Sequence, residues 1–206
     1  ITRISINPQT MNQKTLDLIG RHHTVDMVKD RFYMARELGF DNINMDLIAG
    51  LPGETAEDME DTLRKIEALH PDSLTVHALA IKRAARFGQE GRTAQLHSEI
   101  TQMIEAASGC ARRMGLKPYY LYRQKNMKGN FENVGYAKVD KAGIYNILIM
   151  EEKQPIIALG AGGSSKLVFD HGKRIERVEN VKDVTSYIAR IDEMIERKRT
   201  GIGTWL

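Results

Sequence analysis

The sequence predicts an α/β fold in which a parallel sheet wound with crossover helices precedes a small antiparallel β extension and a C-terminal helix. Up to Gly115, strand-like segments alternate with amphipathic helical patterns at spacings of about 30 to 45 residues, as crossovers between parallel strands require. After Gly115, β-like segments follow one another across short turns, which is typical of antiparallel hairpins. We therefore expect two domains, residues 1–115 and 116–206.

The first predicted strand is Ile1 to Ile6, which alternates apolar and polar residues and ends just before a proline. A short helix follows, with Asn12 as its N-cap and Gly20 at its end. The next helix begins after Thr24 and ends at Gly39. Its apolar residues recur at three- and four-residue steps: Val25, Val28, Phe32, Ala35 and Leu38. Strand and helices thus alternate from the start of the chain.

The second predicted strand, Asn42 to Ala49, is a buried apolar run with one carboxylate, Asp46, inside it. Thr55 and Asp58 have the spacing of a capping box for the helix that follows. One face of that helix is apolar: Met59, Leu63, Ile66 and Leu69. A carboxylate within an apolar strand needs a polar role, so Asp46 is the first candidate site residue.

The remaining elements are a third strand at residues 73–81, a long helix at 93–114 and the β extension. The β-like segments of the extension are LKPYYLYRQ (116–124), YNILIMEE (145–152), QPIIALGAGG (154–163) and SKLVFD (165–170). A single amphipathic helix from Asp183 to Arg199 follows, with an apolar stripe of Val184, Ile188, Ile191 and Ile195. The final GIGTWL has no periodicity and predicts a frayed end.

The composition is that of an ordinary globular protein. Among 206 residues, 30 Lys and Arg against 27 Asp and Glu give a net charge of +3, which excludes a histone-like basic protein. No apolar run approaches the roughly 20 residues of a membrane helix, and no signal peptide opens the chain, so we expect a cytoplasmic protein. The single cysteine, Cys110, allows no internal disulfide and cannot alone hold a metal cluster. Its place on a helix stripe predicts a small buried hydrophobe.

Two weaker patterns carry little chemistry. The glycine-rich segment from Gly160 to Ser165 could approach a phosphate, but it leads into a β-like segment rather than a helix, so a tight turn is favoured. The six histidines are scattered, and none forms a His-x-x-x-His pair, so no zinc site is expected.

Two polar features are stronger candidates. The segment from Lys117 to Lys128 carries four cations, three tyrosines and no acid. Binding of nucleic acid, a pocket for a polyanionic aromatic ligand, and a solvated basic strand edge all explain it. Gln9 and Asp46 lie near the carboxyl ends of predicted parallel strands, where α/β folds build their sites.

Three motifs resemble a known family. DLIAGLPGET (46–55) resembles the fifth-strand segment of radical S-adenosylmethionine (radical SAM) enzymes. RISINPQTMN (3–12) with LDLIGRHHT (16–24) resembles the fourth-strand RxSxGxQ motif and the following Gly-Arg-x-His of the oxygen-independent coproporphyrinogen III oxidases. Asn7 and Pro8 stand in place of the usual Gly-Val. YYLYRQKNMKGNFENVGYA and IIALGAGGSSK resemble the HemZ-type branch of these coproporphyrinogen dehydrogenases.

This resemblance implies the C-terminal half of a partial (β/α)6 TIM-like barrel, strands 4–6, followed by a family-specific extension. Members use a 4Fe-4S cluster to cleave SAM, and the 5′-deoxyadenosyl radical starts the oxidative decarboxylation of propionates to vinyls in haem biosynthesis. The family's cofactor-binding positions match Gln9, Arg21, Asp46 and Ala80. Charge alone makes Arg123, Lys125 and Lys128 candidates to hold substrate propionates. The implied partners are coproporphyrinogen III and an unidentified electron donor, with neither membrane nor nucleic acid expected. No catalytic residue is assigned.

The chain departs from the family pattern in one decisive way: it has no CxxxCxxC cluster motif, and the second-strand glycine motif and third-strand acid are missing too. We therefore expect the cluster ligands to lie in an N-terminal half outside this chain, which alone would bind no cluster and have no radical activity. The alternative functions are a haem-binding chaperone of the same family and a radical SAM enzyme that modifies tRNA. Structural alternatives also stay open: a helix-end charge for Arg21 and a carboxylate capping nearby amides for Asp46.

Overall fold

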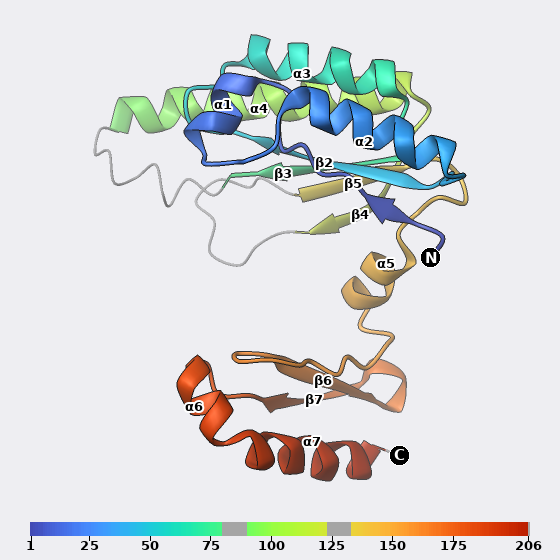
Figure 1. Cartoon of the computed structure of the whole chain (residues 1–206), viewed down its shortest axis with the longest axis vertical. Helices are drawn as coiled ribbons and strands as arrows, with labels where there is room; N and C mark the ends of the chain where they lie inside the picture. Colours follow the sequence, from blue (N-terminus) through green and yellow to red (C-terminus); the bar gives the residue numbers. More distant parts are fainter. Residues whose placement is uncertain (80–89, 123–132, 206) are drawn as a thin grey trace. The chain divides into compact units, whose positions relative to one another are not determined.

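The computed structural model describes residues 1–79, 90–122 and 133–205, and it divides into two compact units, Ile1–Gly143 and Ile144–Leu206. Unit 1 contains a five-stranded sheet of order β1-β2-β3-β5-β4 (Figure 1). The strands are β1 Ile4–Ser5, β2 Ile43–Ala49, β3 Ser73–Ala78, β4 Lys117–Tyr122 and β5 Asn133–Ala137. The parallel pairing predicted for the first three strands is confirmed, whereas β5 runs antiparallel to both β3 and β4.

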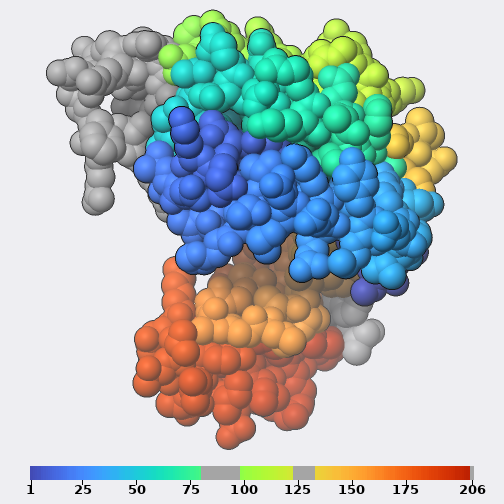
Figure 2. All heavy atoms as spheres, turned by 45° about the horizontal axis from the view of Figure 1, so that its top comes forward, coloured from blue at the N-terminus to red at the C-terminus, as the bar shows by residue number. Residues whose placement is uncertain are grey.

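Helices cover one face of this sheet (Figure 1). They are α1 Gln13–Leu18, α2 Val25–Glu37, α3 Ala56–Leu69 and α4 Glu90–Arg113. Figure 2 shows α1, α2 and α3, in blue to teal, as one continuous layer on this side of unit 1. The predicted N-caps hold: Asn12 accepts from the Lys14 N–H, Thr24 accepts from the Met27 N–H, and Thr55 forms a capping box with Asp58.

The two faces of the sheet differ in chemistry because side chains alternate along each strand. The face under the helices is apolar and fully buried, and its members include Ile43, Met45, Leu47, Leu74 and Val76. The opposite face carries polar side chains from the same two strands: Asn44, Asp46, Ser73, Thr75 and His77. Burial of the first set stabilises the unit, and the second set forms a polar wall.

The strand β5 is not among the elements that the sequence predicts, because this stretch contains Asn and Gly, which are rare in strands. A Cβ on Gly135 would lie 2.0 Å from Cε1 of Tyr120, so the glycine allows the Tyr120 ring to cross the strand. Because β4 and β5 continue the sheet, unit 1 extends to Gly143. A domain boundary between residues 115 and 116 stays a prediction.

Unit 2 contains one antiparallel hairpin, β6 Ser164–Phe169 with β7 Arg174–Glu179, joined by the 3-10 turn η2 Asp170–Gly172. The strand predicted at SKLVFD is confirmed, but its hairpin partner is β7, which is not among the predicted segments. The prediction of a strand at residues 145–152 is wrong, because Ile144–Met150 forms the helix α5. An apolar run of this length has no period that separates helix from strand. The segment at 154–163 contributes only the isolated bridge between Ile156 and Lys166.

The predicted C-terminal helix is two helices, α6 Val184–Ala189 and α7 Ile191–Trp205, which meet at Arg190. The prediction of a frayed end is wrong for residues 201–205, which continue α7 to Trp205. The predicted apolar stripe of Val184, Ile188, Ile191 and Ile195 is exposed. Within the described residues, no helix has the length and apolar character to cross a membrane.

Candidate functional site

Gln9 is held against the carboxyl end of β2 by its backbone. Its N–H donates to the Asp46 carbonyl at 3.0 Å, and its carbonyl accepts from the Ile48 N–H at 2.9 Å. Its φ of 69° lies in the left-handed region, which a non-glycine residue keeps only where its surroundings hold it. The predicted site residues Gln9 and Asp46 are therefore neighbours, and the hydrogen bond between them joins their main chains.

The Asp46 carboxylate lies on the polar wall between two partners. The Asn44 amide donates to Oδ1 at 2.6 Å, and Nε2 of His77 lies 3.8 Å from Oδ2. Burial alone would raise the pKa of Asp46, but the interactions with His77 and Asn44 outweigh burial and hold that pKa below its usual value. The side chain is 22% exposed, so an ionised carboxylate is available to a ligand.

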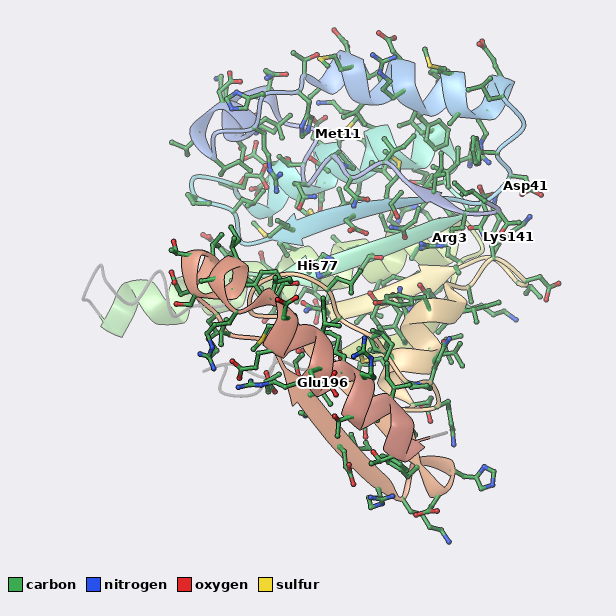
Figure 3. All side chains as sticks on the ribbon, turned by 60° about the horizontal axis from the view of Figure 1, so that its bottom comes forward. Arg3, Met11, Asp41, His77, Lys141 and Glu196 are labelled. Carbon is green, nitrogen blue, oxygen red and sulfur yellow. The ribbon has the colours of Figure 1, made fainter. Side chains whose placement is uncertain are left out.

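The rest of the polar wall is linked by hydroxyl and amide groups. The Thr75 hydroxyl donates to the side-chain Oδ1 of Asn44 at 3.2 Å, and the Asn44 side-chain NH2 donates to the Ser5 hydroxyl at 3.3 Å. Near the start of β1, Arg3 donates to the Ser73 hydroxyl at 3.3 Å; Figure 3 labels Arg3 there and His77 on β3. The wall therefore offers donors and acceptors along β1, β2 and β3.

Arg21 lies in the loop between α1 and α2, and its side chain is exposed. Within the described residues its guanidinium forms no hydrogen bond or ion pair. The loop is fixed next to the site, because His23 Nε2 lies 3.2 Å from the carbonyl oxygen of Pro8, which directly precedes Gln9. No hydrogen bond or ion pair joins the side chains of Gln9, Arg21 and Asp46 in the described parts of the chain.

Comparison with known proteins identifies the family of this arrangement. Residues 1–66 match the family model described as the radical SAM superfamily. The oxygen-independent coproporphyrinogen-III oxidase-like protein HemZ of Bacillus subtilis is 44% identical over 200 residues, which are 96% of this chain and 40% of that protein. The chain belongs to the radical SAM superfamily.

More distant relatives have other names. The heme chaperone HemW of Bacillus subtilis is 26% identical over 92% of this chain and 47% of its own length. The solved structure titled coproporphyrinogen III oxidase (HemN) from Escherichia coli matches with a TM-score of 0.65 at 21% identity. That match covers 94% of this chain and 44% of the HemN chain, and it shows the fold. The chain spans less than half the length of each of these three proteins.

Radical SAM proteins typically use SAM and a 4Fe-4S cluster, and the residues of this chain fit only the first. The ionised Asp46, the exposed Arg21 and the amide of Gln9 are suitable partners for the charged methionyl group and the ribose hydroxyls of SAM. The one cysteine does not fit a cluster ligand. Cys110 is fully buried in α4, and burial raises its pKa to about 11. The described residues contain no group of three metal-binding side chains.

Four predicted site residues lie outside the described parts of the chain. They are Ala80, predicted to meet the adenine, and the three predicted propionate ligands Arg123, Lys125 and Lys128. The glycine-rich turn can be assessed: the N–H groups of Gly162 and Gly163 donate to carbonyls of Val181 and Gly160. Those donors are used internally, which favours the turn over a phosphate-binding loop.

Sequence reasoning missed two polar residues beside the site, His77 and Glu54. His77 contacts Asp46, and Glu54 is buried in the loop after β2. His77 had the signal that singled out Asp46, since it is a polar residue within an apolar strand segment, whereas Glu54 lies in a turn and had no such signal.

Proposed function

We propose that this chain forms part of the SAM-binding wall of a coproporphyrinogen III oxidase-like enzyme, with Gln9, Arg21 and Asp46 in contact with the cofactor. The observation that carries the proposal is the backbone pairing of Gln9 with Asp46 and Ile48. It brings two polar residues from different crossover units to the carboxyl ends of parallel strands, where sites form in this fold class. In this proposal β1, β2 and β3 are strands 4–6 of a partial barrel.

Each side chain has a role that suits its chemistry. The Arg21 guanidinium pairs with the methionyl carboxylate, and the Asp46 carboxylate accepts hydrogen bonds from the ribose hydroxyls or the methionyl amine. The Gln9 amide donates and accepts beside Asp46. The backbone of Ala80 meets the adenine edge. Ionisation of Asp46 at neutral pH supports its role as an acceptor.

The proposed substrate is coproporphyrinogen III, whose propionates Arg123, Lys125 and Lys128 would bind through charge. Bound SAM would supply the 5′-deoxyadenosyl radical for oxidative decarboxylation to vinyl groups, given a reduced 4Fe-4S cluster and an electron donor. The cluster ligands are proposed to lie outside this chain, because its single cysteine does not fit.

The cofactor assignment is tested by SAM affinity in the full-length protein. Asp46→Ala should raise the Kd for SAM by about ten-fold or more, the effect of losing one good hydrogen bond to a charged group. Asp61→Ala is the matched control, because Asp61 is a surface carboxylate of α3 that pairs with Arg64 and Lys65. Equal affinities of the Asp46 variant and the wild type would reject the assignment.

The enzyme and the chaperone are separated by their products. Anaerobic incubation of the full-length protein with SAM, a reductant and coproporphyrinogen III should release carbon dioxide and form vinyl groups. Tight haem binding without decarboxylation would favour the chaperone, a function named for the HemW relatives at 26% identity. Salt-dependent binding of tRNA without porphyrin turnover would favour the tRNA-modifying alternative.

A further inference from the structure

A buried polar cluster joins the loop after β1 to the loop after β2. Its members, called the Thr10 cluster below, are Thr10, Glu54 and Thr62, and each is at most 5% exposed. The Thr10 hydroxyl donates to Glu54 Oε1 at 2.5 Å, and the hydroxyls of Thr10 and Thr62 lie 3.2 Å apart. Since Thr62 belongs to α3, three segments of unit 1 meet at this cluster.

The cluster has a direction that follows from counting protons. Thr10 has one hydroxyl proton and gives it to Glu54, so the Thr62 hydroxyl must donate to Thr10. Thr62 in turn accepts the Met11 N–H at 3.1 Å, and Thr10 accepts the Asn12 N–H at 3.2 Å. The backbone directly after Gln9 is therefore fixed by side chains (Met11 is labelled in Figure 3), and Glu54 is the final acceptor of the chain of hydrogen bonds.

Glu54 is also the least satisfied member of the cluster. Its second oxygen, Oε2, is buried and has no hydrogen-bond partner in the described part of the chain, where Glu54 forms no ion pair either. Burial and, to a smaller extent, the nearby charge of Asp58 raise the pKa of Glu54, and the interactions with Thr10 and Thr15 offset only part of that rise. A buried carboxyl that faces no cation in the described residues loses hydration without gaining an opposite charge, so its hydrogen bond from Thr10 is the main contact that holds it.

We propose that Glu54 is a positioning residue, which holds Gln9 in its binding conformation through Thr10; this inference rests on the proposed SAM site. Gln9 and Thr10 are consecutive, and Gln9 keeps its left-handed backbone only while both sides of it are held. On one side the bonds to Asp46 and Ile48 hold it, and on the other side the Thr10 cluster does. Glu54 thereby couples the loop after β2 to the residue that faces the cofactor.

The test compares three variants of the full-length protein. Glu54→Ala removes the acceptor, Glu54→Gln keeps an acceptor of the same shape without a charge, and Glu60→Ala removes an exposed carboxylate from α3 as the control. Two quantities are measured: the Kd for SAM, and the hydrogen exchange of the Gln9 and Ile48 amides, whose protection reports the pairing of Gln9 directly.

Glu54→Ala should weaken SAM binding by about ten-fold and speed the hydrogen exchange of both amides. Glu54→Gln should keep the Kd and both exchange rates within about two-fold of wild type. The control Glu60→Ala should also leave them within that range. Thr10→Val, which lacks the hydroxyl, provides the same test if Glu54→Ala does not fold. Unchanged exchange in Glu54→Ala or Thr10→Val, or a Glu54→Gln variant as defective as Glu54→Ala, would overturn the proposal. If the wild type does not bind SAM, the proposed function fails, and the exchange rates still decide whether Glu54 positions Gln9.

Discussion

Two buried carboxyls lie at opposite ends of the same strands, and they are held in opposite ways. Asp72, at the amino ends of β2 and β3, is 4% exposed, and Glu54, beyond the carboxyl end of β2, is 5% exposed. Asp72 accepts from Arg36 at 2.6 Å, from Lys138 at 2.9 Å and from the Ile43 N–H at 3.0 Å. Glu54 accepts from the Thr10 hydroxyl at 2.5 Å, and Thr15 is also beside it.

Because the two groups are almost equally buried, their partners decide the direction in which the pKa of each is shifted. Burial raises the pKa of both, but two cations and a backbone N–H bring the pKa of Asp72 below its ordinary value, whereas that of Glu54 stays raised. The amino end is thus closed by an ion pair network with two cations, and the carboxyl end is held by hydrogen bonds from hydroxyl groups. This contrast matches the division of α/β folds into a stability end and a site end.

The largest expected effect is the loss of the Asp72 carboxylate. Asp72→Ala leaves Arg36, Lys138 and the Ile43 N–H without their acceptor, so the free energy of unfolding should fall by about 3 kcal/mol. Denaturant unfolding measures this, with Asp61→Ala as the surface control. The Kd for SAM of the folded variant should not change. A cost below about 1 kcal/mol would show that the amino end is not closed by this network.

The second prediction is that stability depends on pH with opposite sign at the two ends. Asp72 has a lowered pKa, so its contribution is present above the ordinary value of 3.8 and is lost as the pH falls through the folded pKa. Glu54 has a raised pKa, so its contribution is present below the ordinary value of 4.5 and is lost as the pH rises through the folded pKa. Each group changes the free energy of unfolding by at most about 1.4 kcal/mol per pH unit.

These signs are measured by unfolding wild type, Asp72→Asn and Glu54→Gln across a pH series. Relative to Asp72→Asn, the wild type should lose stability towards acid. Relative to Glu54→Gln, it should lose stability as the pH rises above 4.5. Parallel curves for wild type and Glu54→Gln would mean that Glu54 titrates alike in the folded and unfolded chain, and the contrast between the two ends would fail.

The features that depend on neighbouring residues could be predicted from the sequence. Helix caps such as Asn12 and Thr24, and the apolar strand around Asp46, depend on neighbours within a few residues, so the sequence predicted them. Asp72 directly precedes β3, but its partners Arg36 and Lys138 are 36 and 66 residues away. Those contacts depend on strand order and have no local pattern.

The features that depend on packing between distant segments could not be predicted. Glu54 has the sequence of a turn residue in LPGET, and its burial arises from Thr10, which is 44 residues earlier. Gly135 similarly gives no local sign of a strand, although it lies in β5 where the Tyr120 ring crosses that strand. The wrong strand prediction at α5 has a different cause, because an uninterrupted apolar run has no period. Positions of this kind follow from the fold and cannot precede it.

The smallest expected effect separates the two cations at the amino end. Lys138 is 42% exposed, so its attraction to Asp72 is screened by solvent, and Lys138→Met should lower the free energy of unfolding by about 0.5 kcal/mol. Arg36→Met should cost more, because Arg36 is 29% exposed and also donates to the carbonyls of Phe40 and His70. Denaturant unfolding of the two variants gives both values. Equal losses of unfolding free energy in the two variants would mean that the exposed Lys138 stabilises Asp72 as much as Arg36 does. The difference in exposure between the two cations would then not decide their contributions.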